Sequence, residues 1–207
     1  EETGLILPIG DWVMQTACQH LRQWSQHLSD DFSLAINLSP RQFKSGDLAD
    51  KVAETLQRYR IPAHQLDLEI TESLLLDDQP TTQALMQQFK AMGLRLSIDD
   101  FGTGYSALSY LRRFSLDVLK IDRSFISGLP QDQDLKAMVK AVIYMAHELN
   151  LMVIAEGIET EAQLKFLEAQ HCDYGQGFWF SRALPPQEFF NYALQGMVCQ
   201  SRVPLKL

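Results

Sequence analysis

The chain has 207 residues, of which 46% are hydrophobic and 21% are charged, and its formal net charge at pH 7 is −8. This is the composition of an ordinary globular protein, which needs neither disulfides nor a structural metal to fold. The negative charge argues against DNA or RNA as a partner, because neutralising phosphates requires a basic surface. It does not exclude an anionic small ligand, provided that metal ions supply local positive charge.

The cysteines and the hydropathy pattern bear on location. Three cysteines without CxxC spacing indicate reduced thiols in a cytoplasmic protein. No segment reaches the roughly 18 consecutive apolar residues of a membrane-spanning helix. The first residues also lack the basic and then apolar pattern of a signal peptide. We therefore expect a cytoplasmic domain without membrane contact of its own, although a longer parent protein could be tethered to a membrane.

Short apolar segments alternate with longer amphipathic segments along the chain. Residues 1–7 have the pattern of a helix end that runs into a turn near Pro8. The following elements are predicted, in chain order: helix 10–28, strand 34–38, helix 48–59, strand 66–70, helix 81–92, strand 95–99, helix 107–114, strand 118–121, helix 134–149, strand 152–155, helix 161–169, strand 177–180 and helix 187–194. Such alternation predicts a parallel sheet covered by helices. We expect one domain over 1–200, a disordered tail over 201–207, and Trp12 and Trp24 packed on the sheet.

The predicted strands carry bulky residues on one face and small or polar residues on the other. A parallel strand that is buried on both sides would be apolar on both faces, so the second face lines something wet or ionic. Polar residues also gather at the carboxyl ends of the strands: Asn37, Glu69, Asp99, Asp100, Lys120, Asp122, Glu156 and Gln176. Successive units that aim polar groups at one rim favour a barrel over an open sheet. The predicted fold class is therefore α/β, a modified (β/α)8 TIM-type barrel.

The number of predicted strands is smaller than such a barrel requires. Six strands are predicted instead of eight, and a typical barrel needs about 250 residues. We therefore expect the first one or two strands to precede Glu1 in the complete domain.

Five of the rim residues offer only oxygen ligands: Asn37, Glu69, Asp99, Asp100 and Glu156. Hard oxygen donors favour Mg²⁺, Mn²⁺ or Ca²⁺ over Zn²⁺. The adjacent Asp99 and Asp100 suit a two-metal site, in which ions about 3.5–4 Å apart promote in-line phosphoryl displacement. Lys120 would add a fixed positive charge near the phosphorus or orient the attacking water. The alternative is that these acids cap the following helices, which explains one such residue better than five.

Several motifs together resemble the EAL family of bacterial cyclic-di-GMP phosphodiesterases. They are AINLS (35–39), LDLEITES (66–73), DDFGTGYSALSYL (99–111), LKIDRSFI (119–126), VIAEGIET (153–160) and YGQGFWFSRAL (174–184). The resemblance runs from Glu1 to about Phe190. It implies a modified (β/α)8 barrel that hydrolyses cyclic-di-GMP to linear pGpG with two Mg²⁺ or Mn²⁺ ions and is inhibited by Ca²⁺. It also implies a homodimer and, often, GGDEF or sensor domains on the parent chain.

The resemblance implies a role for each matching residue. The implied metal ligands are Asn37, Glu69, Asp99, Asp100 and Glu156. Lys120 resembles the lysine that positions the attacking water, and Gln176 resembles the glutamine beside it. Glu72 resembles the glutamate that anchors the loop Phe101–Ser106, which includes Gly102, Thr103 and Gly104 and couples to the dimer interface. Asp122 and Glu159 match family positions near the substrate.

The chain departs from the family pattern in one respect. The Glu-Ala-Leu tripeptide occurs nowhere in the 207 residues. In the family its glutamate is a metal ligand, and an arginine shortly after it contacts substrate phosphate. We expect the chain to start downstream of this motif. The sequence leaves open a catalytically inactive cyclic-di-GMP receptor or a protein-interaction module. An unrelated metal-dependent barrel enzyme, such as an aldolase, is disfavoured by the DDFGTGYS segment.

Overall fold

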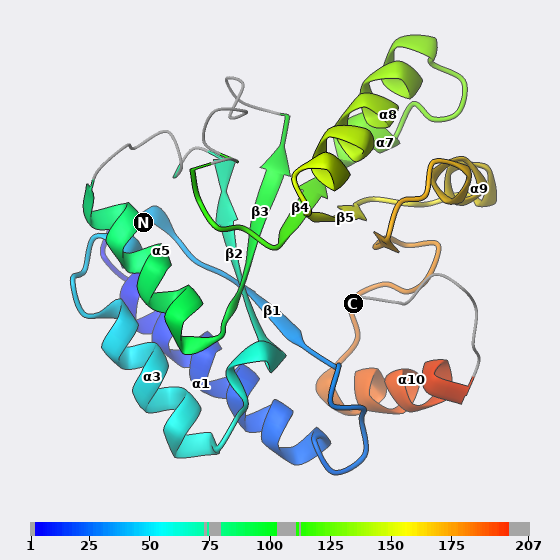
Figure 1. Ribbon diagram of the computed structural model, residues 1–207. Coiled ribbons are helices and arrows are strands. Elements are labelled where there is room, and N and C mark those ends of the chain that lie inside the picture. Colours follow the sequence, from blue (N-terminus) through cyan, green and yellow to red (C-terminus); the bar gives the residue numbers. More distant parts are fainter. Residues whose placement is uncertain (1–2, 73, 75–79, 103–110, 112, 199–207) are drawn as a thin grey trace. The chain divides into compact units, whose positions relative to one another are not determined.

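The computed structural model describes residues 3–72, 74, 80–102, 111 and 113–198 (Figure 1). The chain folds into two compact units. The first unit comprises Glu1–Ser97 and Ala107–Leu116, and the second unit comprises Ile98–Ser106 and Asp117–Leu207. The chain passes from one unit to the other within strand β3 (Arg95–Phe101). The predicted tail 201–207 and most of the predicted helix 107–114 lie outside the described residues.

The described residues contain one six-stranded sheet whose strands follow one another in sequence order. The strands are β1 (Leu34–Asn37), β2 (Leu66–Thr71), β3, β4 (Val118–Ile121), β5 (Met152–Ala155) and β6 (Tyr174–Gly175). The β1–β2, β4–β5 and β5–β6 pairs are parallel. Sequence order without a reversal is the order of a barrel segment, whereas a doubly wound sheet reverses at a switch point.

The first unit packs its helices through one apolar face each. Its helices are α1 (Ile6–Trp24), α2 (Pro40–Phe43), α3 (Leu48–Tyr59) and α5 (Pro80–Met92), with a 3-10 turn η1 at Ala63–Gln65. Helix α1 buries Met14, Cys18 and Leu21, which recur at the spacing of one helical face. Helix α3 runs beside α1 (Figure 1). Beneath them, Leu68 and Ile70 of β2 are fully buried.

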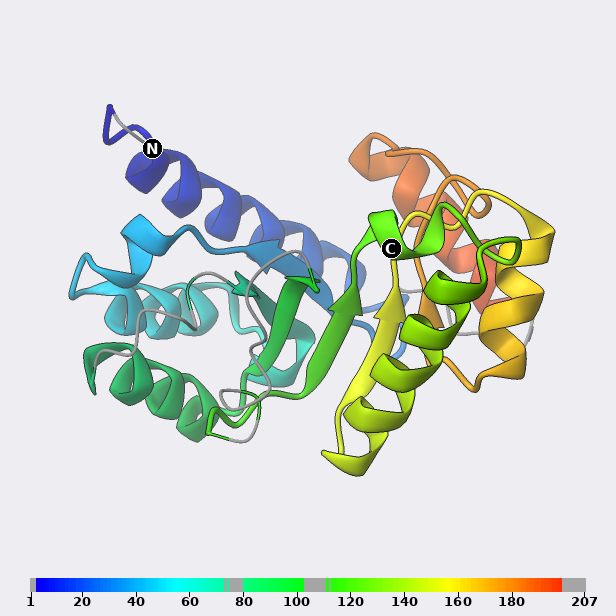
Figure 2. The same ribbon diagram turned by 90° about the horizontal axis from the view of Figure 1, so that it is seen from above.

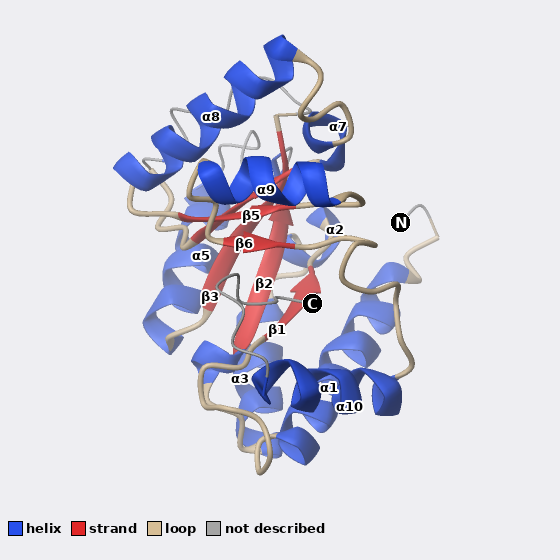
Figure 3. Cartoon of the chain, turned by 90° about the vertical axis from the view of Figure 1, so that its right-hand side faces the viewer, coloured by secondary structure: helices blue, strands red, loops and turns tan. Residues whose placement is uncertain are grey.

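The second unit repeats the strand and helix alternation. Its helices are α7 (Arg123–Ile126), α8 (Gln133–Glu148), α9 (Glu161–Ala169) and α10 (Pro186–Val198). Helix α8 runs alongside β5 (Figure 2) and buries Val139, Ile143 and Ala146. The short β6 lies next to β5 (Figure 3).

Two element predictions were wrong. The sixth strand is Tyr174–Gly175 rather than 177–180. Residues 177–180 instead form a turn, in which the Phe180 amide donates to the Gly177 carbonyl. Helix α1 begins at Ile6 and runs through Pro8, where a turn was predicted, and it ends at Trp24. Proline is tolerated there because the amides of the first helical turn have no partner within the helix.

The packing prediction for the tryptophans holds for one of them. Trp24 is buried, whereas Trp12 is 66% exposed. Two nearby residues are also exposed, Ile9 on α1 and Leu5 at its N-cap, and both precede Trp12 at helical spacing. The prediction that Trp12 packs on the sheet is therefore wrong.

The described cysteines and helices add two findings. Cys18 and Cys172 carry free thiols. Burial raises the pKa of Cys18 to about 11 and that of Cys172 to about 12, so both thiols stay protonated and unreactive near neutral pH.

Within the described part of the chain, no helix combines the length and apolar character that crossing a membrane requires.

Candidate metal and active site

Three carboxylates of the second unit converge at the ends of two strands. Asp99 and Asp100 lie in β3, and Glu156 directly follows β5. Each offers a carboxylate oxygen, and these oxygens lie within 4.8 Å of one another. We call Asp99, Asp100 and Glu156 the acidic trio. Because its donors are all carboxylate oxygens, the trio has the chemistry of a site for a hard divalent cation.

The backbone at Asp100 explains how two adjacent residues reach the same site. Successive side chains of an extended strand point to opposite faces. Asp100 has φ 55°, a left-handed conformation that interrupts this alternation. Its amide donates to Asp99 Oδ1 over 3.0 Å, which fixes the bend. Non-glycine residues in this conformation are uncommon and gather at functional sites, although aspartate tolerates it better than most residues.

A buried lysine lies between two members of the acidic trio. Lys120 Nζ is 3.1 Å from Asp99 Oδ1 and 2.7 Å from Glu156 Oε1, and its side chain is 4% exposed. An ammonium group removed from water requires such anionic partners. Three carboxylates and one ammonium together carry a formal charge of −2. The cluster therefore retains negative charge that a bound cation would balance.

The pKa values of the acidic trio reflect this excess of negative charge. Burial raises the pKa of Glu156, Lys120 opposes that rise, and Asp99 and Asp100 add to it. Burial likewise raises the pKa of Asp100, reinforced by Asp99 and Asp122 and opposed by Lys120. Both shifts disfavour the ionised forms, and a bound cation would lower these pKa values again by favouring ionisation.

Three further predicted residues lie in the second unit. Asp122 caps α7, and its Oδ1 accepts from the Ser124 amide at 2.9 Å. Burial alone would raise the pKa of Asp122, but hydrogen bonds from Ser124 and the Arg123 amide hold it below its ordinary value. Glu159 pairs with Arg123 across 2.8 Å. The Gln176 amide donates to the Ala155 carbonyl at 2.8 Å, which places the exposed Gln176 beside the end of β5.

The capping alternative concerned Asn37, Glu69, Asp99, Asp100 and Glu156, and none of these five is the N-cap of a described helix, whereas a residue outside that set caps α7. Asp122 is the N-cap of α7. The other helix caps among the described residues that use an acidic residue are Asp47 and Asp132, which precede α3 and α8. No member of the acidic trio caps a described helix, and two of its members contact Lys120 instead.

The remaining predicted residues belong to the first unit or to the loop after β3. Asn37 and Glu69 are register partners at the carboxyl ends of β1 and β2, and Glu69 is buried while Asn37 is exposed. Glu72 is buried just after β2. In the loop, Phe101 is buried and Gly102 has φ 99°. Thr103 and Gly104 lie outside the described residues.

Sequence reasoning missed two polar contacts near these residues. Ser97 Oγ donates to Asp67 Oδ1 over 2.7 Å, and both side chains are buried in the first unit. Asp67 and Ser97 belong to the small or polar faces predicted for these two strands. Their hydrogen bond satisfies both side chains and so allows them to be buried. The Arg123–Glu159 pair carried no signal in the sequence, because it depends on how α7 meets the segment after β5.

The comparisons with known proteins define the class to which this fold and site belong. The sequence profile of the EAL domain matches residues 1–183, and the chain belongs to the EAL domain family. This confirms the resemblance predicted from the motifs. MucR of Pseudomonas aeruginosa, a bifunctional diguanylate cyclase/cyclic di-GMP phosphodiesterase, is 44% identical over 188 residues, which are 91% of this chain and 27% of MucR.

Two further relatives support the assignment. The cyclic di-GMP phosphodiesterase NbdA of the same species is 43% identical over 187 residues, which are 89% of this chain and 24% of NbdA. The solved structure of the PaMucR phosphodiesterase in complex with c-di-GMP is similar with a TM-score of 0.87 and 43% identity, and the match covers 91% of this chain and 76% of that one. This likeness confirms the predicted α/β barrel class. The chain spans about a quarter of the length of these two curated relatives.

Proposed function

We propose that the complete domain to which this chain belongs hydrolyses cyclic-di-GMP to linear pGpG in a reaction that depends on divalent metal ions. The observation that carries the proposal is the acidic trio around the buried Lys120 in a member of the EAL domain family. The relatives MucR and NbdA, which are named as cyclic di-GMP phosphodiesterases, support the choice of substrate.

The donor set fits Mg²⁺ or Mn²⁺. The acidic trio offers only carboxylate oxygens, and the formal charge of −2 that it carries together with Lys120 calls for a cation. We assign the trio as metal ligands, together with Asn37 and Glu69, which share a register position at their strand ends. When bound, the metal ions would supply Lewis acidity and lower the pKa of a bound water.

Lys120 has the position of a fixed charge for the reaction. Its Nζ is held by Asp99 and Glu156 in a site from which water is largely excluded. An ammonium in such surroundings stabilises developing charge on phosphate oxygens far better than one in water, and its remaining protons can orient the attacking water. We further assign Gln176 beside this water, Asp122 and Glu159 on the substrate side, and Glu72 as the anchor of the loop Phe101–Ser106.

The proposal includes partners that the parent protein would supply. MucR is named as a bifunctional diguanylate cyclase and phosphodiesterase, so we infer a GGDEF or sensor domain on the chain that contains these 207 residues. We also infer a cytoplasmic homodimer. Sedimentation equilibrium of the protein tests the dimer, and a monomer across the accessible concentration range would contradict it.

The direct test measures linear dinucleotide formed from cyclic-di-GMP with Mg²⁺ or Mn²⁺. We expect turnover by the complete wild-type domain and none by its Asp99→Ala variant, with circular dichroism confirming that the variant is folded. Replacing Mg²⁺ with Ca²⁺ should inhibit, because Ca²⁺ prefers longer and less regular coordination. Unchanged turnover in Asp99→Ala would contradict the proposal. Nucleotide binding without turnover by the wild type would instead identify a receptor.

A further inference from the structure

Helix α7 follows β4 at the end of the sheet where the acidic trio lies. It comprises Arg123–Ile126 and begins directly after Asp122, which caps it. Lys120 lies in β4, three residues before Arg123. Helix α7 is therefore close in sequence to Lys120, which pairs with Asp99 and Glu156.

The side chain of Arg123 covers the residue that follows Glu156. Gly157 has φ 73°, and a Cβ atom built on it would lie 2.3 Å from Arg123 Cγ and 2.9 Å from Arg123 Cδ. The aliphatic part of Arg123 thus fills the space where any other residue would carry its side chain. The guanidinium then reaches Glu159, with Nη2 2.8 Å from Oε1. Arg123 thus contacts both Gly157 and Glu159.

A second residue of α7 covers the segment that follows Asp99 and Asp100. Gly102 has φ 99°, and a Cβ atom built on it would lie 2.7 Å from Phe125 Cε2 and Cζ. The Phe125 ring therefore packs flush against the backbone two residues after Asp100. Both glycines adopt conformations that side chains rarely tolerate, so the close approach of α7 depends on glycine at both positions.

We propose that α7 is a positioning element for the acidic trio, with Arg123 and Phe125 as its two contact residues. Arg123 fixes the backbone after Glu156, and Phe125 fixes the backbone after Asp100. Removing the contacts that support metal ligands typically lowers the metal affinity of a site about tenfold or more. The inference rests on the proposed function for the role of the acidic trio, and goes beyond it by assigning residues that touch neither metal nor substrate.

The ion pair and the packing of Arg123 can be separated by substitution. Arg123→Ala removes both, Arg123→Met keeps the aliphatic chain and removes the charge, and Arg123→Lys keeps both in altered form. Lys165→Ala is the matched control, because it removes an ion pair of the same 2.8 Å length, with Glu161, from the exposed face of α9. Phe125→Ala and Phe125→Leu make the corresponding comparison at Gly102.

The first readout is the Mn²⁺ concentration that gives half-maximal turnover, together with kcat and KM for cyclic-di-GMP. We expect Arg123→Ala and Phe125→Ala to raise the half-maximal Mn²⁺ concentration about tenfold. Arg123→Met, Arg123→Lys, Phe125→Leu and Lys165→Ala should stay within about twofold of the wild type, since packing over the glycines is kept or untouched. If Arg123→Met is as impaired as Arg123→Ala, or if both alanine variants match Lys165→Ala, the positioning role is overturned.

The second readout needs no substrate, so it separates this inference from the proposed function. The Glu156 amide donates to the Ile121 carbonyl and the Ile158 amide donates to the Gln176 carbonyl, each at 3.0 Å. Hydrogen exchange at these amides should be at least about threefold faster in Arg123→Ala than in Arg123→Met. A wild type without turnover would refute the proposed function while exchange still decides the inference. Equal exchange in both variants would overturn it.

Discussion

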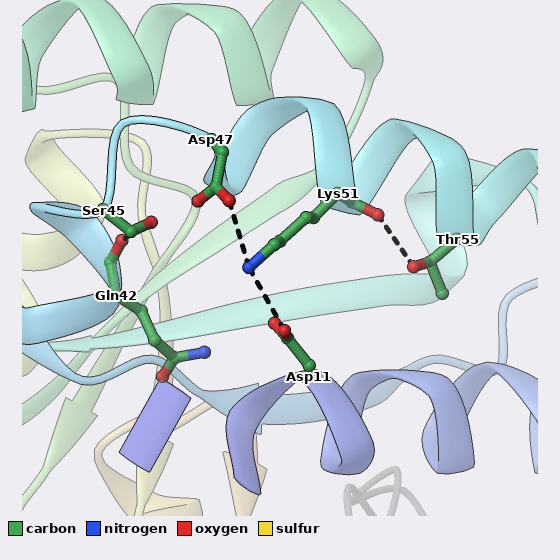
Figure 4. A network of polar contacts seen from close by, with 6 residues as sticks. All are labelled: Asp11, Gln42, Ser45, Asp47, Lys51 and Thr55. Atoms are coloured by element: carbon green, nitrogen blue, oxygen red, sulfur yellow. Dashed lines mark hydrogen bonds and ion pairs between the residues drawn. The ribbon is translucent and has the colours of Figure 1, made fainter. Parts of the chain in front are cut away.

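Two lysines in this chain each bind a pair of carboxylates, but in different surroundings. Lys51 Nζ lies 3.1 Å from Asp11 Oδ2 and 3.1 Å from Asp47 Oδ2, and its side chain is 38% exposed (Figure 4). This contact ties α1 to α3, and Thr55 Oγ1 donates to the Lys51 carbonyl at 2.7 Å. Lys120 makes the same kind of contact with Asp99 and Glu156, but it is 4% exposed.

The difference appears in the pKa values of the acidic partners. A hydrogen bond from Ser45, followed by the contact with Lys51, lowers the pKa of Asp47. Burial raises the pKa of Glu156 even though Lys120 lies only 2.7 Å away. Solvated ion pairs favour the charged state of both partners, whereas desolvation and an excess of neighbouring carboxylates disfavour it. The comparison shows why the Lys120 cluster is suited to bind a cation and the Lys51 cluster to join two helices.

The largest predicted effect follows from removing the buried lysine. Lys120→Met should lower turnover of cyclic-di-GMP by about 10²–10³, the usual effect of removing a preorganised charge. It should also destabilise the metal-free protein by about 3–5 kcal/mol, because buried carboxylates lose their partner, and Mn²⁺ should restore part of this stability. Initial rates and urea denaturation with and without Mn²⁺ measure both effects. Turnover within tenfold of the wild type would remove the special role given to Lys120.

A smaller effect is expected at a buried acid that accepts a hydrogen bond from a neutral hydroxyl group. Ser97 Oγ donates to Asp67 Oδ1 over 2.7 Å inside the first unit. Ser97→Ala removes this donor from a buried carboxylate and should destabilise the protein by about 1–3 kcal/mol. Urea denaturation measures the loss. A urea midpoint equal to that of the wild type would show that the buried Ser97–Asp67 hydrogen bond does not stabilise the protein. It would weaken the comparison between buried and exposed contacts.

The smallest effect is expected at the exposed lysine. Lys51→Met should lower the Tm by less than about 3 °C and leave turnover unchanged, because exposed ion pairs contribute little. The pKa of Lys51 is raised, chiefly by hydrogen bonds to Asp47 and Asp11. Its stabilisation is therefore complete below its ordinary pKa and is lost as pH rises through the raised value.

The acidic partner of Lys51 sets the other limit of this pH window. Since the pKa of Asp47 is lowered, its contribution is present above the ordinary carboxyl range and is lost as pH falls through the lowered value. The difference in Tm between wild type and Lys51→Met should thus be largest near neutral pH and disappear at both extremes. Thermal melts from about pH 3 to about pH 11 test this window. A Tm difference that is independent of pH would rule out the ion pairs as its cause.

Sequence patterns predicted those elements whose ends are determined by neighbouring residues in the sequence. Helix α9 begins at Glu161 as predicted, because Thr160 and Gln163 form a capping box there. Strands β4 and β5 also have the predicted bounds. The prediction for β6 was wrong because a two-residue strand has no periodicity, whereas the aromatic run at 178–180 resembles a strand.

The candidate site was predictable only in part, for a physical reason. That polar residues collect at strand ends follows from the alternation of strands and helices, and it identified Asp99, Asp100 and Glu156 before their proximity was known. The left-handed backbone at Asp100 and the cover that Arg123 gives Gly157 depend on tertiary packing. Such contacts leave no local pattern, so they required the structure.

The most direct test of the account compares one carboxylate from each lysine cluster by calorimetric titration with Mn²⁺ alone. Asp99→Ala and Asp11→Ala each remove an acid that contacts a lysine at 3.1 Å. The account predicts that the wild type and Asp11→Ala bind Mn²⁺ alike, while Asp99→Ala loses the binding. Equal Mn²⁺ binding by Asp99→Ala and the wild type, or none by the wild type, would contradict the claim that the acidic trio is a metal site.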